Sequence, residues 1–432
     1  EKTMASIQKR GKTYRITVSN GRKPDGTQIL ETTTFCPDPN RTEKQNQKAL
    51  EIFALEFEQK VKSGKYLDGE KLTFQAFTEI WQQDYALQHL EASTLQLYNN
   101  LLRLHILPVI GNIKLSKLQP NQLNKLYNAL ATERKDGKEG GYSTKTIKHV
   151  HNIISAIYSS AVKWNIVLDN PCDRVEPPKQ APAGEKIKYF TIEQTQIFLD
   201  LLTKDYQTTC RAHDRVDDTG KSYHVAEYSE TRHIPIQFRL FFLLAIYGGL
   251  RRGELIALEW SDMDFTANSI SITKSTTLVN SKPITKAPKT RTSVRTITVP
   301  RSVMNVAREW KKEQLQYRMA LGSQWIGENH VFIQWNGKQM YPDTPYTTFK
   351  RIIRRYNETV KNEAERLPDI PLHGLRHTSA TLLISQNVDV RTVSGRLGHA
   401  QTSTTMDIYS HALKKLDEKA SNALDDLLTK KA

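Results

Sequence analysis

The chain has 432 residues, a net charge of +16 and a pI of about 9.5, with 38% hydrophobic and 25% charged residues. This length allows two or three domains, and the composition is typical of a soluble globular protein. The positive charge favours a polyanionic partner, duplex nucleic acid before an anionic membrane surface. The sequence contains no run of about 18 apolar residues, so we expect no membrane-spanning helix, and we expect no signal peptide before the first strands.

The three cysteines indicate which cellular compartment suits the protein. Cys36, Cys172 and Cys210 lie far apart and form no C-x-x-C pair. We therefore expect neither a disulfide framework nor a thiolate zinc site, and a reducing cytoplasm fits this pattern.

The first 35 residues predict a small, basic antiparallel sheet. Polar and apolar residues alternate over 14–18, and turn signals follow at Asn20-Gly21 and Asp25-Gly26. Residues 1–26 hold seven Lys or Arg against two acids. Such a sheet either lies in a DNA groove or is an ordinary solvated β-surface. A helix is predicted over 42–63, with an apolar residue every three or four positions.

Residues 72–164 are predicted to be helical throughout. The expected helices cover 73–90, then 93–106 with Pro108 as its stop, then a third from Pro120, and a fourth with an apolar stripe over 147–161. The opposite side of the fourth helix is basic, which suits a solvated bundle and a DNA clamp equally. The Pro-rich segment 169–188 predicts a linker. We therefore divide the chain into 1–70, 71–168, the linker, and 189–432.

The last domain mixes helices with short strands. A buried helix is predicted over 236–247, strands over 269–277 and 291–299, and helices over 303–317 and 346–365. The polar segment 203–233 is predicted to be a surface insertion, with a possible hairpin and no assigned chemistry. The candidate DNA-binding residues of the whole chain are Lys9, Arg10, Lys12 and Arg15 in the sheet, Lys145 and Lys148 in the bundle, and Arg351 and Arg354 in the last domain.

The final quarter carries the clearest chemical pattern. His373-Gly-Leu-Arg376-His377 is followed by Leu397-Gly-His399 and then by Tyr409. On a helix, His373 and Arg376 share one side, and this pair suits a phosphate. Tyr409 offers a hydroxyl as a nucleophile. A zinc site at His373-x-x-x-His377 is not expected, because the Glu of His-Glu-x-x-His is missing.

Five short motifs, taken in chain order, together resemble those of a known family. Gly249-Leu-Arg251-Arg-Gly-Glu254-Leu and Pro288-Lys289-Thr290 precede the three motifs above, and together they resemble the tyrosine recombinases, or phage integrase family. The resemblance implies a small arm-binding β-sheet domain, an all-α core-binding bundle, and a mainly α catalytic domain with a small antiparallel sheet. It implies catalytic roles for Arg251, Lys289, His373, Arg376, His399 and Tyr409, with Glu254 bracing Arg251.

The family chemistry needs no cofactor. The implied reaction is attack of Tyr409 on a DNA phosphate, giving a 3′-phosphotyrosyl link and later a Holliday junction. The implied partners are double-stranded attachment sites, a homotetramer on DNA, an excisionase and a DNA-bending host factor, in the cytoplasm of a bacterial host at its nucleoid. The apolar stripe over 416–427 either packs on its own domain or docks on a neighbouring protomer.

Three other functions remain alternatives at this point. A type IB topoisomerase-like enzyme would share the site but relax DNA, and the N-terminal sheet favours recombination over it. A DNA-binding regulator with a silent site and a metal-dependent nuclease are the others. The full set of catalytic residue types argues against the regulator.

Overall fold

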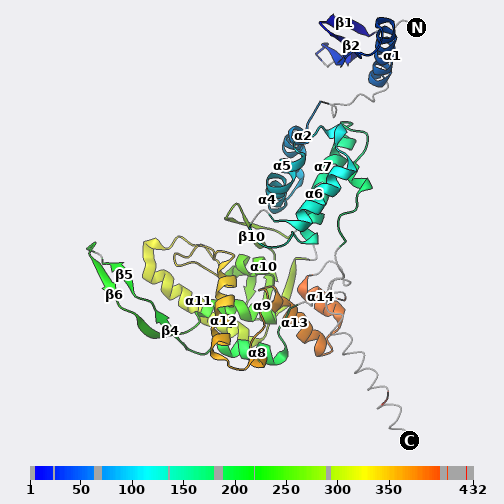
Figure 1. Ribbon diagram of the computed structural model, residues 1–432. Helices are drawn as coiled ribbons and strands as arrows, with labels where there is room; N and C mark the ends of the chain where they lie inside the picture. Colours follow the sequence, from blue (N-terminus) through cyan, green and yellow to red (C-terminus); the bar gives the residue numbers. More distant parts are fainter. Residues whose placement is uncertain are drawn as a thin grey trace. The chain divides into compact units, whose positions relative to one another are not determined.

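The computed structural model describes residues 5–22, 25–62, 71–134, 137–179, 188–217, 219–288 and 293–398, together with Met406 and Asp425. The chain divides into two compact units, Glu1–Ala183 and Gly184–Ala432, and the division falls in the segment predicted to be a linker (Figure 1). Lys289, His399, Tyr409 and the predicted tail helix lie outside the described residues. None of the helices within the described ranges is long and apolar enough to cross a membrane.

The predicted N-terminal sheet is present. It consists of β1 (Ser6–Arg10), β2 (Thr13–Arg22) and β3 (Gln28–Phe35), antiparallel and in that order. The helix α1 (Glu43–Lys62) covers one side of it. Ile16 and Val18, two positions apart on β2, are buried against Leu50, Phe57 and Val61 of this helix. Alternation in the strand and a three-to-four residue repeat in the helix therefore produce one small core.

The rest of the first unit is a helical bundle. Its elements are α2 (Phe74–Trp81), the π-helical turn η2 (Gln82–Ala86), α3 (Leu87–His89), α4 (Ala92–Leu101), the π-helical turn η3 (Leu102–Ile106), α5 (Leu107–Ile110), α6 (Pro120–Thr132) and α7 (Thr144–Lys163). The predicted stripe of α7, including Ile147, Val150 and Ile154, is fully buried. Cys172 and Val175 join the same core, so the bundle continues past residue 168 into the segment predicted to be a linker.

The predicted end of the second helix of the bundle is wrong. The sequence predicts that Pro108 ends the second helix, but helical structure runs without a break from Ala92 to Ile110. Proline normally breaks a helix because it lacks an N–H and its ring clashes with the carbonyl four residues before it. Here the π-helical turn Leu102–Ile106 comes directly before α5 and changes the hydrogen-bond register, which lets the proline be accommodated.

The second unit is built around the buried helix α9 (Ile236–Tyr247), as predicted. Phe241 and Phe242 are fully buried, and α11 (Arg301–Leu321), α12 (Thr344–Thr359) and α13 (Gly374–Ser385) all contact α9. The remaining helices are α8 (Ile192–Leu201), α10 (Arg252–Ala257) and α14 (Val390–Leu397). The predicted helix over 346–365 is shorter at its C-terminal end, because α12 ends at Thr359 and a single 3₁₀ turn follows at Glu363–Glu365.

Short strands accompany these helices. A three-stranded antiparallel sheet has the order β12 (Arg295–Thr298), β9 (Ser269–Ile272), β8 (Met263–Asp264). The predicted strand 269–277 is in fact two strands, because the chain leaves β9 and forms a separate hairpin of β10 (Ser275–Val279) with β11 (Lys282–Lys286). The predicted insertion contains two ribbons in series. Strand β4 (Tyr206–Cys210) pairs with β7 (Tyr228–Arg232), and β5 (His213–Val216) pairs with β6 (Ser222–Val225).

Candidate active site

Arg251 stands at the first turn of α10, where the glycines before it shape the chain. Gly249 has φ +63°, and a Cβ there would lie 2.7 Å from Leu397 Cδ2, so this position needs glycine. The Arg251 backbone N–H donates to Glu254 Oε2 at 2.8 Å, and its Nη1 donates to Glu254 Oε1 at 2.7 Å. Glu254 therefore caps the helix and holds the arginine side chain, which agrees with the bracing contact that the sequence predicts.

A second arginine, which none of the sequence motifs indicates, lies on the same carboxylate. Arg295, at the start of β12, donates to Glu254 Oε1 at 3.1 Å and to Oε2 at 2.9 Å. Glu254 is only 4% exposed. Burial by itself would raise the pKa of Glu254, but hydrogen bonds and charge from Arg295, and then from Arg251, outweigh it and lower that pKa. The carboxylate is thus ionised and shared by two guanidinium groups.

Arg376 lies on α13, and it is 2% exposed. Its Nη1 donates to the Gly249 carbonyl at 2.7 Å, and its Nη2 donates to the Leu397 carbonyl at 2.6 Å. The first bond ties α13 to the turn that carries Arg251, so two arginines 125 positions apart in the sequence (376 − 251) belong to one cluster. A buried cation has to be hydrogen-bonded, and these carbonyls supply acceptors.

His373 and His377 flank Arg376 at the start of α13. The two rings are 4.9 Å apart, nearly perpendicular, and His373 is exposed while His377 is partly buried. Burial, and secondarily the charge of Arg376, lowers the pKa of His377 to about 4. His377 is therefore neutral near pH 7, and it does not add a positive charge to the site.

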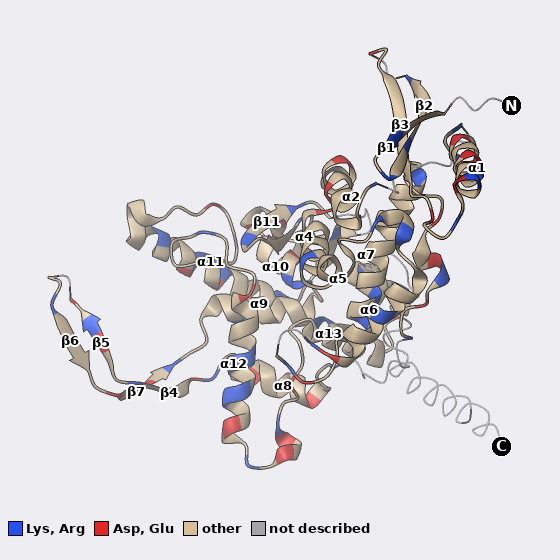
Figure 2. Cartoon of the chain, turned by 45° about the horizontal axis from the view of Figure 1, so that its top comes forward, with Lys and Arg blue, Asp and Glu red and all other residues tan. Residues whose placement is uncertain are grey.

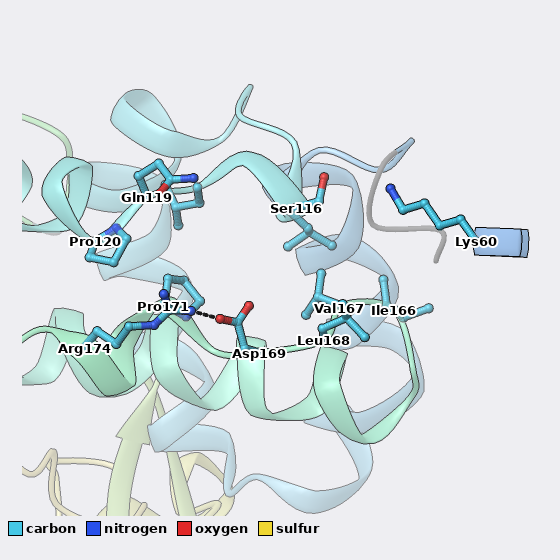
Figure 3. Close-up of a pocket in the computed structure, with 12 residues that line it drawn as sticks. Lys60, Ser116, Gln119, Pro120, Ile166, Val167, Leu168, Asp169, Pro171 and Arg174 are labelled. Atoms are coloured by element: carbon cyan, nitrogen blue, oxygen red, sulfur yellow. Dashed lines mark ion pairs between the residues drawn. The ribbon is translucent and has the colours of Figure 1, made fainter. Parts of the chain in front are cut away.

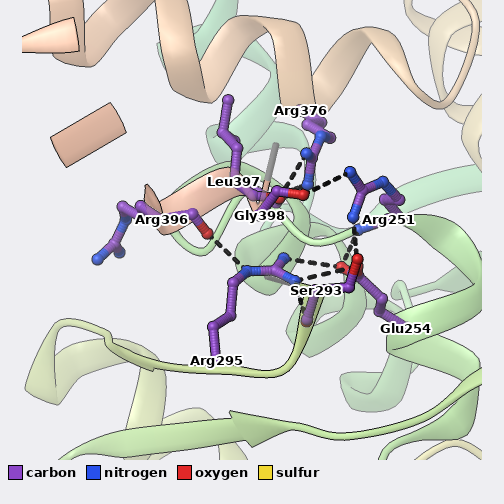
Figure 4. Close-up of polar contacts among 9 residues, drawn as sticks. Arg251, Glu254, Ser293, Arg295, Arg376, Arg396, Leu397 and Gly398 are labelled. Carbon is purple, nitrogen blue, oxygen red and sulfur yellow. Dashed lines mark hydrogen bonds and ion pairs between the residues drawn. The ribbon is translucent and has the colours of Figure 1, made fainter. Parts of the chain in front are cut away.

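The end of α14 is where the arginines meet (Figure 4). Three consecutive carbonyls there accept from three different arginine side chains: Arg396 O from Arg295 Nε at 2.8 Å, Leu397 O from Arg376 Nη2 at 2.6 Å, and Gly398 O from Arg251 Nη2 at 3.1 Å. The last carbonyls of a helix lack partners within the helix, so they are natural acceptors. His399 follows this turn directly in the sequence.

The structure thus brings Arg251 and Arg376 into one cluster, and His373 precedes Arg376 at the start of α13. Glu254 lies with them. Lys289, His399 and Tyr409 lie outside the described residues, and their positions stay predictions. Among the described residues, no three His, Cys, Asp or Glu side chains gather as metal ligands do.

The predicted DNA-binding residues occupy exposed or half-exposed positions on three parts of the chain. On the N-terminal sheet, Lys9 pairs across from Tyr14 and Arg10 across from Thr13, while Arg15 pairs across from Gln8. Cross-strand partners share a side of the sheet and neighbours along a strand alternate. Arg10 and Arg15 therefore lie on the side opposite α1, and Lys9 on the side of Ile16; Lys12 is exposed in the turn.

The two other groups of basic residues lie on helices. Lys145 and Lys148 are exposed on α7, and Arg351 and Arg354 are exposed on α12, where Figure 2 shows Lys and Arg in blue. Arg354 forms an exposed pair with Glu358 at 3.9 Å, and the neighbouring Lys350 and Arg355 have partners of their own. Lys350 pairs with Asp369, and the Arg355 guanidinium stacks on Tyr206, with Cζ 3.3 Å from the ring centroid, at the base of the β4–β7 ribbon.

A separate pocket of about 280 Å³ lies in the first unit, lined by Ser116, Gln119, Ile166, Asp169 and Arg174 among others (Figure 3). Asp169 and Arg174 form an ion pair in its wall. Arg174 therefore already has a carboxylate partner, and Lys60 is the other basic residue that lines the pocket.

Comparison with known proteins identifies the class. Residues 221–415 match the phage integrase family, and residues 73–131 match the phage integrase N-terminal SAM-like domain, which together span more than half of the chain. The chain belongs to the phage integrase family of tyrosine recombinases, and the resemblance and the fold class expected from the sequence are confirmed.

Individual relatives agree with this assignment. The chain is 29% identical to the ICEBs1 integrase of Bacillus subtilis over 68% of its length and 69% of that protein. It is 26% identical to a protein named tyrosine recombinase XerC-like of Caldanaerobacter subterraneus, over 96% of both. Among solved structures, the Tn1549 transposon integrase in complex with a circular intermediate DNA matches with a TM-score of 0.58 and 17% identity, over 80% of this chain and 98% of that one. At that identity the match concerns the fold alone.

Proposed function

We propose that this enzyme is a site-specific DNA recombinase that integrates and excises a mobile element through a covalent tyrosyl–DNA intermediate. The observation that carries the proposal is the meeting of Arg251 and Arg376 on neighbouring carbonyls, those of Gly398 and Leu397. The two guanidinium groups come from separate elements and lie beside adjacent peptide groups, so their positive charges are fixed together where an anion can approach the exposed side of Arg251. A DNA phosphate is the anion that a tyrosine recombinase attacks.

The charge of the cluster supports the same proposal. Arg251 and Arg295 share the single carboxylate of Glu254, so these three side chains keep a net positive charge. The Arg251 side chain is 36% exposed, so a DNA phosphate can reach it, whereas the Glu254 side chain is 4% exposed and is kept from the DNA by its partners. Fixed positive groups aimed at a developing negative charge stabilise a transition state without reorganising when the reaction occurs.

The proposed reaction follows from these roles. Tyr409 Oη attacks the phosphorus in line, the new O–P bond forms as the bond to the 5′-oxygen breaks, and a 3′-phosphotyrosyl link results. Arg251 and Arg376 stabilise the two non-bridging oxygens. Lys289 protonates the leaving 5′-oxygen, His373 accepts the tyrosyl proton, and His399 hydrogen-bonds the phosphate. The phosphodiester energy is retained in the link, so the reaction needs neither ATP nor another cofactor.

The proposed partners follow the related proteins. The lambda integrase tetramer bound to a Holliday junction has the same fold, with a TM-score of 0.51 and 14% identity over 92% of this chain. We therefore propose that four copies assemble on double-stranded attachment sites in a bacterial cytoplasm, at the nucleoid, with the segment 416–427 docking on a neighbouring copy. An excisionase and a DNA-bending host protein complete the proposed set of partners.

The test uses a nicked attachment-site duplex that traps the covalent intermediate. The wild-type enzyme is expected to give a covalent protein–DNA band on a denaturing gel, with and without EDTA, and Tyr409→Phe is expected to give none. Tyr346→Phe is the matched control, because Tyr346 is an exposed tyrosine of the same unit on α12. A band that survives Tyr409→Phe but disappears in Tyr346→Phe would move the nucleophile. Strand cleavage that leaves no covalent band and is abolished by EDTA would instead indicate a metal-dependent nuclease.

A further inference from the structure

Arg295 is a buried arginine that none of the recognised motifs includes. It begins β12, and its side chain is 7% exposed. Its two Nη atoms contact the two oxygens of Glu254, at 3.1 and 2.9 Å, and its Nε donates to the Arg396 carbonyl at 2.8 Å. The planar guanidinium matches a carboxylate in a way that lysine cannot. One side chain therefore joins α10 to the end of α14.

The bond to Glu254 controls Arg251. The carboxylate accepts four hydrogen bonds, two from Arg295 and two from Arg251. Four acceptor positions are about what an ionised carboxylate offers, so its plane is fully fixed. Arg295 also balances the charge of Glu254. Without it, the carboxylate would be neutralised by Arg251 alone, and less positive charge would remain for a phosphate beside Arg251.

The bond to Arg396 controls the turn that precedes His399. Gly398 has the left-handed conformation, with φ +67°, and a Cβ at this position would lie 2.9 Å from Arg295 Nη1. The guanidinium therefore packs directly against the backbone of this turn. Leu397 and Gly398, which follow Arg396, accept hydrogen bonds on their carbonyls from Arg376 and Arg251, respectively. Arg295 is thus in contact with both sides of the arginine cluster.

We propose that Arg295 is a positioning residue for DNA strand cleavage. It acts through Glu254, which aims the Arg251 guanidinium at the phosphate, and through the Arg396 carbonyl, which fixes the turn before His399. This proposal rests on the proposed recombinase function, because cleavage is the reaction in which the positioning is measured. A displacement of about 1 Å in such a group lowers a rate by about 100-fold.

The experiment compares Arg295→Met and Arg295→Lys with wild type on two nicked duplexes. One has an ordinary scissile phosphate, and the other has a methylphosphonate, in which a methyl group replaces one charged non-bridging oxygen. Arg295→Met is expected to lower the rate of covalent complex formation about 100-fold on the phosphate. On the methylphosphonate, which has less charge for Arg251 to stabilise, the ratio of variant to wild type is expected to recover to within about 10-fold. On the phosphate, the cleavage rate of Arg295→Lys is expected to lie between those of Arg295→Met and wild type.

The methylphosphonate substrate distinguishes a loss of positioning from a loss of folded protein as the cause of a lower cleavage rate. A variant with a smaller folded fraction would lose the same factor on both substrates, which would overturn the proposal. The double variant Arg295→Met with Arg251→Ala is expected to be slower than Arg251→Ala alone by a much smaller factor than Arg295→Met produces in the wild-type background, because the route through Glu254 no longer has Arg251 to aim; fully multiplied losses would also overturn the proposal. Should Arg295→Met fail to fold, Arg295→Lys gives the same two comparisons.

A matched control and the wild-type lane complete the test. Arg366→Met removes an exposed arginine whose ion pair with Glu363 lies on the surface, with side-chain exposures of 44% and 88%, and it is expected to leave both rates unchanged. Wild-type cleavage with no effect of Arg295→Met would refute the role of Arg295 alone. Absence of a covalent band from wild type would instead refute the recombinase function.

Discussion

Glu254→Gln changes one atom of the site and should destabilise the catalytic unit strongly. The carboxylate accepts four hydrogen bonds, two on each oxygen, from Arg251 and Arg295. In the glutamine, one oxygen becomes an NH₂ group that faces two N–H donors, so two of the four bonds are lost. The buried Arg295 also loses its counter-charge. Breaking a buried ion pair by removing one partner costs about 3–5 kcal/mol. We therefore expect Glu254→Gln to lower the free energy of unfolding of the catalytic unit by about 3 kcal/mol or more.

Hydrogen–deuterium exchange with mass spectrometry measures this loss where it occurs. Peptides from α9 and α10 report on the catalytic unit, and peptides from α7 are the internal reference in the other unit. Glu363→Gln is the control, because its ion pair with Arg366 is exposed and such pairs contribute about 1 kcal/mol or less. The reasoning is refuted if Glu254→Gln and Glu363→Gln change the protection of α9 by the same amount.

Three further predictions concern other positions. Gly398→Ala should destabilise the end of α14 by about 1–2 kcal/mol because of its left-handed backbone and the nearby guanidinium, whereas Gly395→Ala, with open space around its Cβ and a helical position, should be neutral or stabilising in the same thermal unfolding assay. His377 has a folded-state pKa of about 4, below its ordinary value of 6.5, so unfolding takes up a proton between these values. Stability should therefore fall by about 2 kcal/mol as pH falls from 6.5 to 4, after allowance for partial exposure, and His377→Gln should flatten that part of the pH profile. Arg15→Gln should weaken binding to duplex DNA and lower the slope of log K against log salt by about 0.9, while Lys9→Gln, on the opposite side of the sheet, should change that slope less; equal effects would contradict a groove-facing sheet.

The residues that could be predicted from the sequence belong to short motifs or to apolar repeats. Arg251 and Glu254 are three positions apart and meet in the first turn of a helix, and the resemblance to the tyrosine recombinases implied their pairing. The motif around Arg376 is also short, because His373 is three positions away, although the carbonyls that Arg376 contacts belong to Gly249 and Leu397. The apolar repeats of α7 and α9 predict their burial, because a repeat of three and four positions makes one side of a helix apolar.

Arg295 was missed because it belongs to none of the recognised motifs, and its partners lie 41 and 101 positions away. A local signal was nevertheless present. Ile297 and Val299, two and four positions further along, are buried, so strand alternation directs Arg295 to the same inner side. A charged residue in the buried register of a strand requires a partner, and that requirement alone distinguishes Arg295 from the exposed basic residues around it.

Two further features of the fold were not predicted, and both have physical causes. Lys282–Lys286 is a strand although it contains Pro283 and two lysines, because it is the outer partner of a two-stranded ribbon and pairing to β10 determines its conformation. The helix through Pro108 continues because a π-helical turn precedes the proline. Neither feature leaves a periodic pattern of apolar residues.

The bonds that close the arginine cluster join parts of the chain that are synthesised at different times. Arg251 and the Gly398 carbonyl are separated by 147 positions, and Arg376 and the Gly249 carbonyl by 127. Contacts with such long separations form late in folding, because the loop entropy must be overcome first. A chain emerging from the ribosome therefore contains Arg251 and Gly249 well before it contains their partners, Gly398 at the end of α14 and Arg376 on α13. DNA-cleaving capacity should appear only when nearly the whole catalytic unit has been made, so an incomplete chain would bind DNA without cutting it.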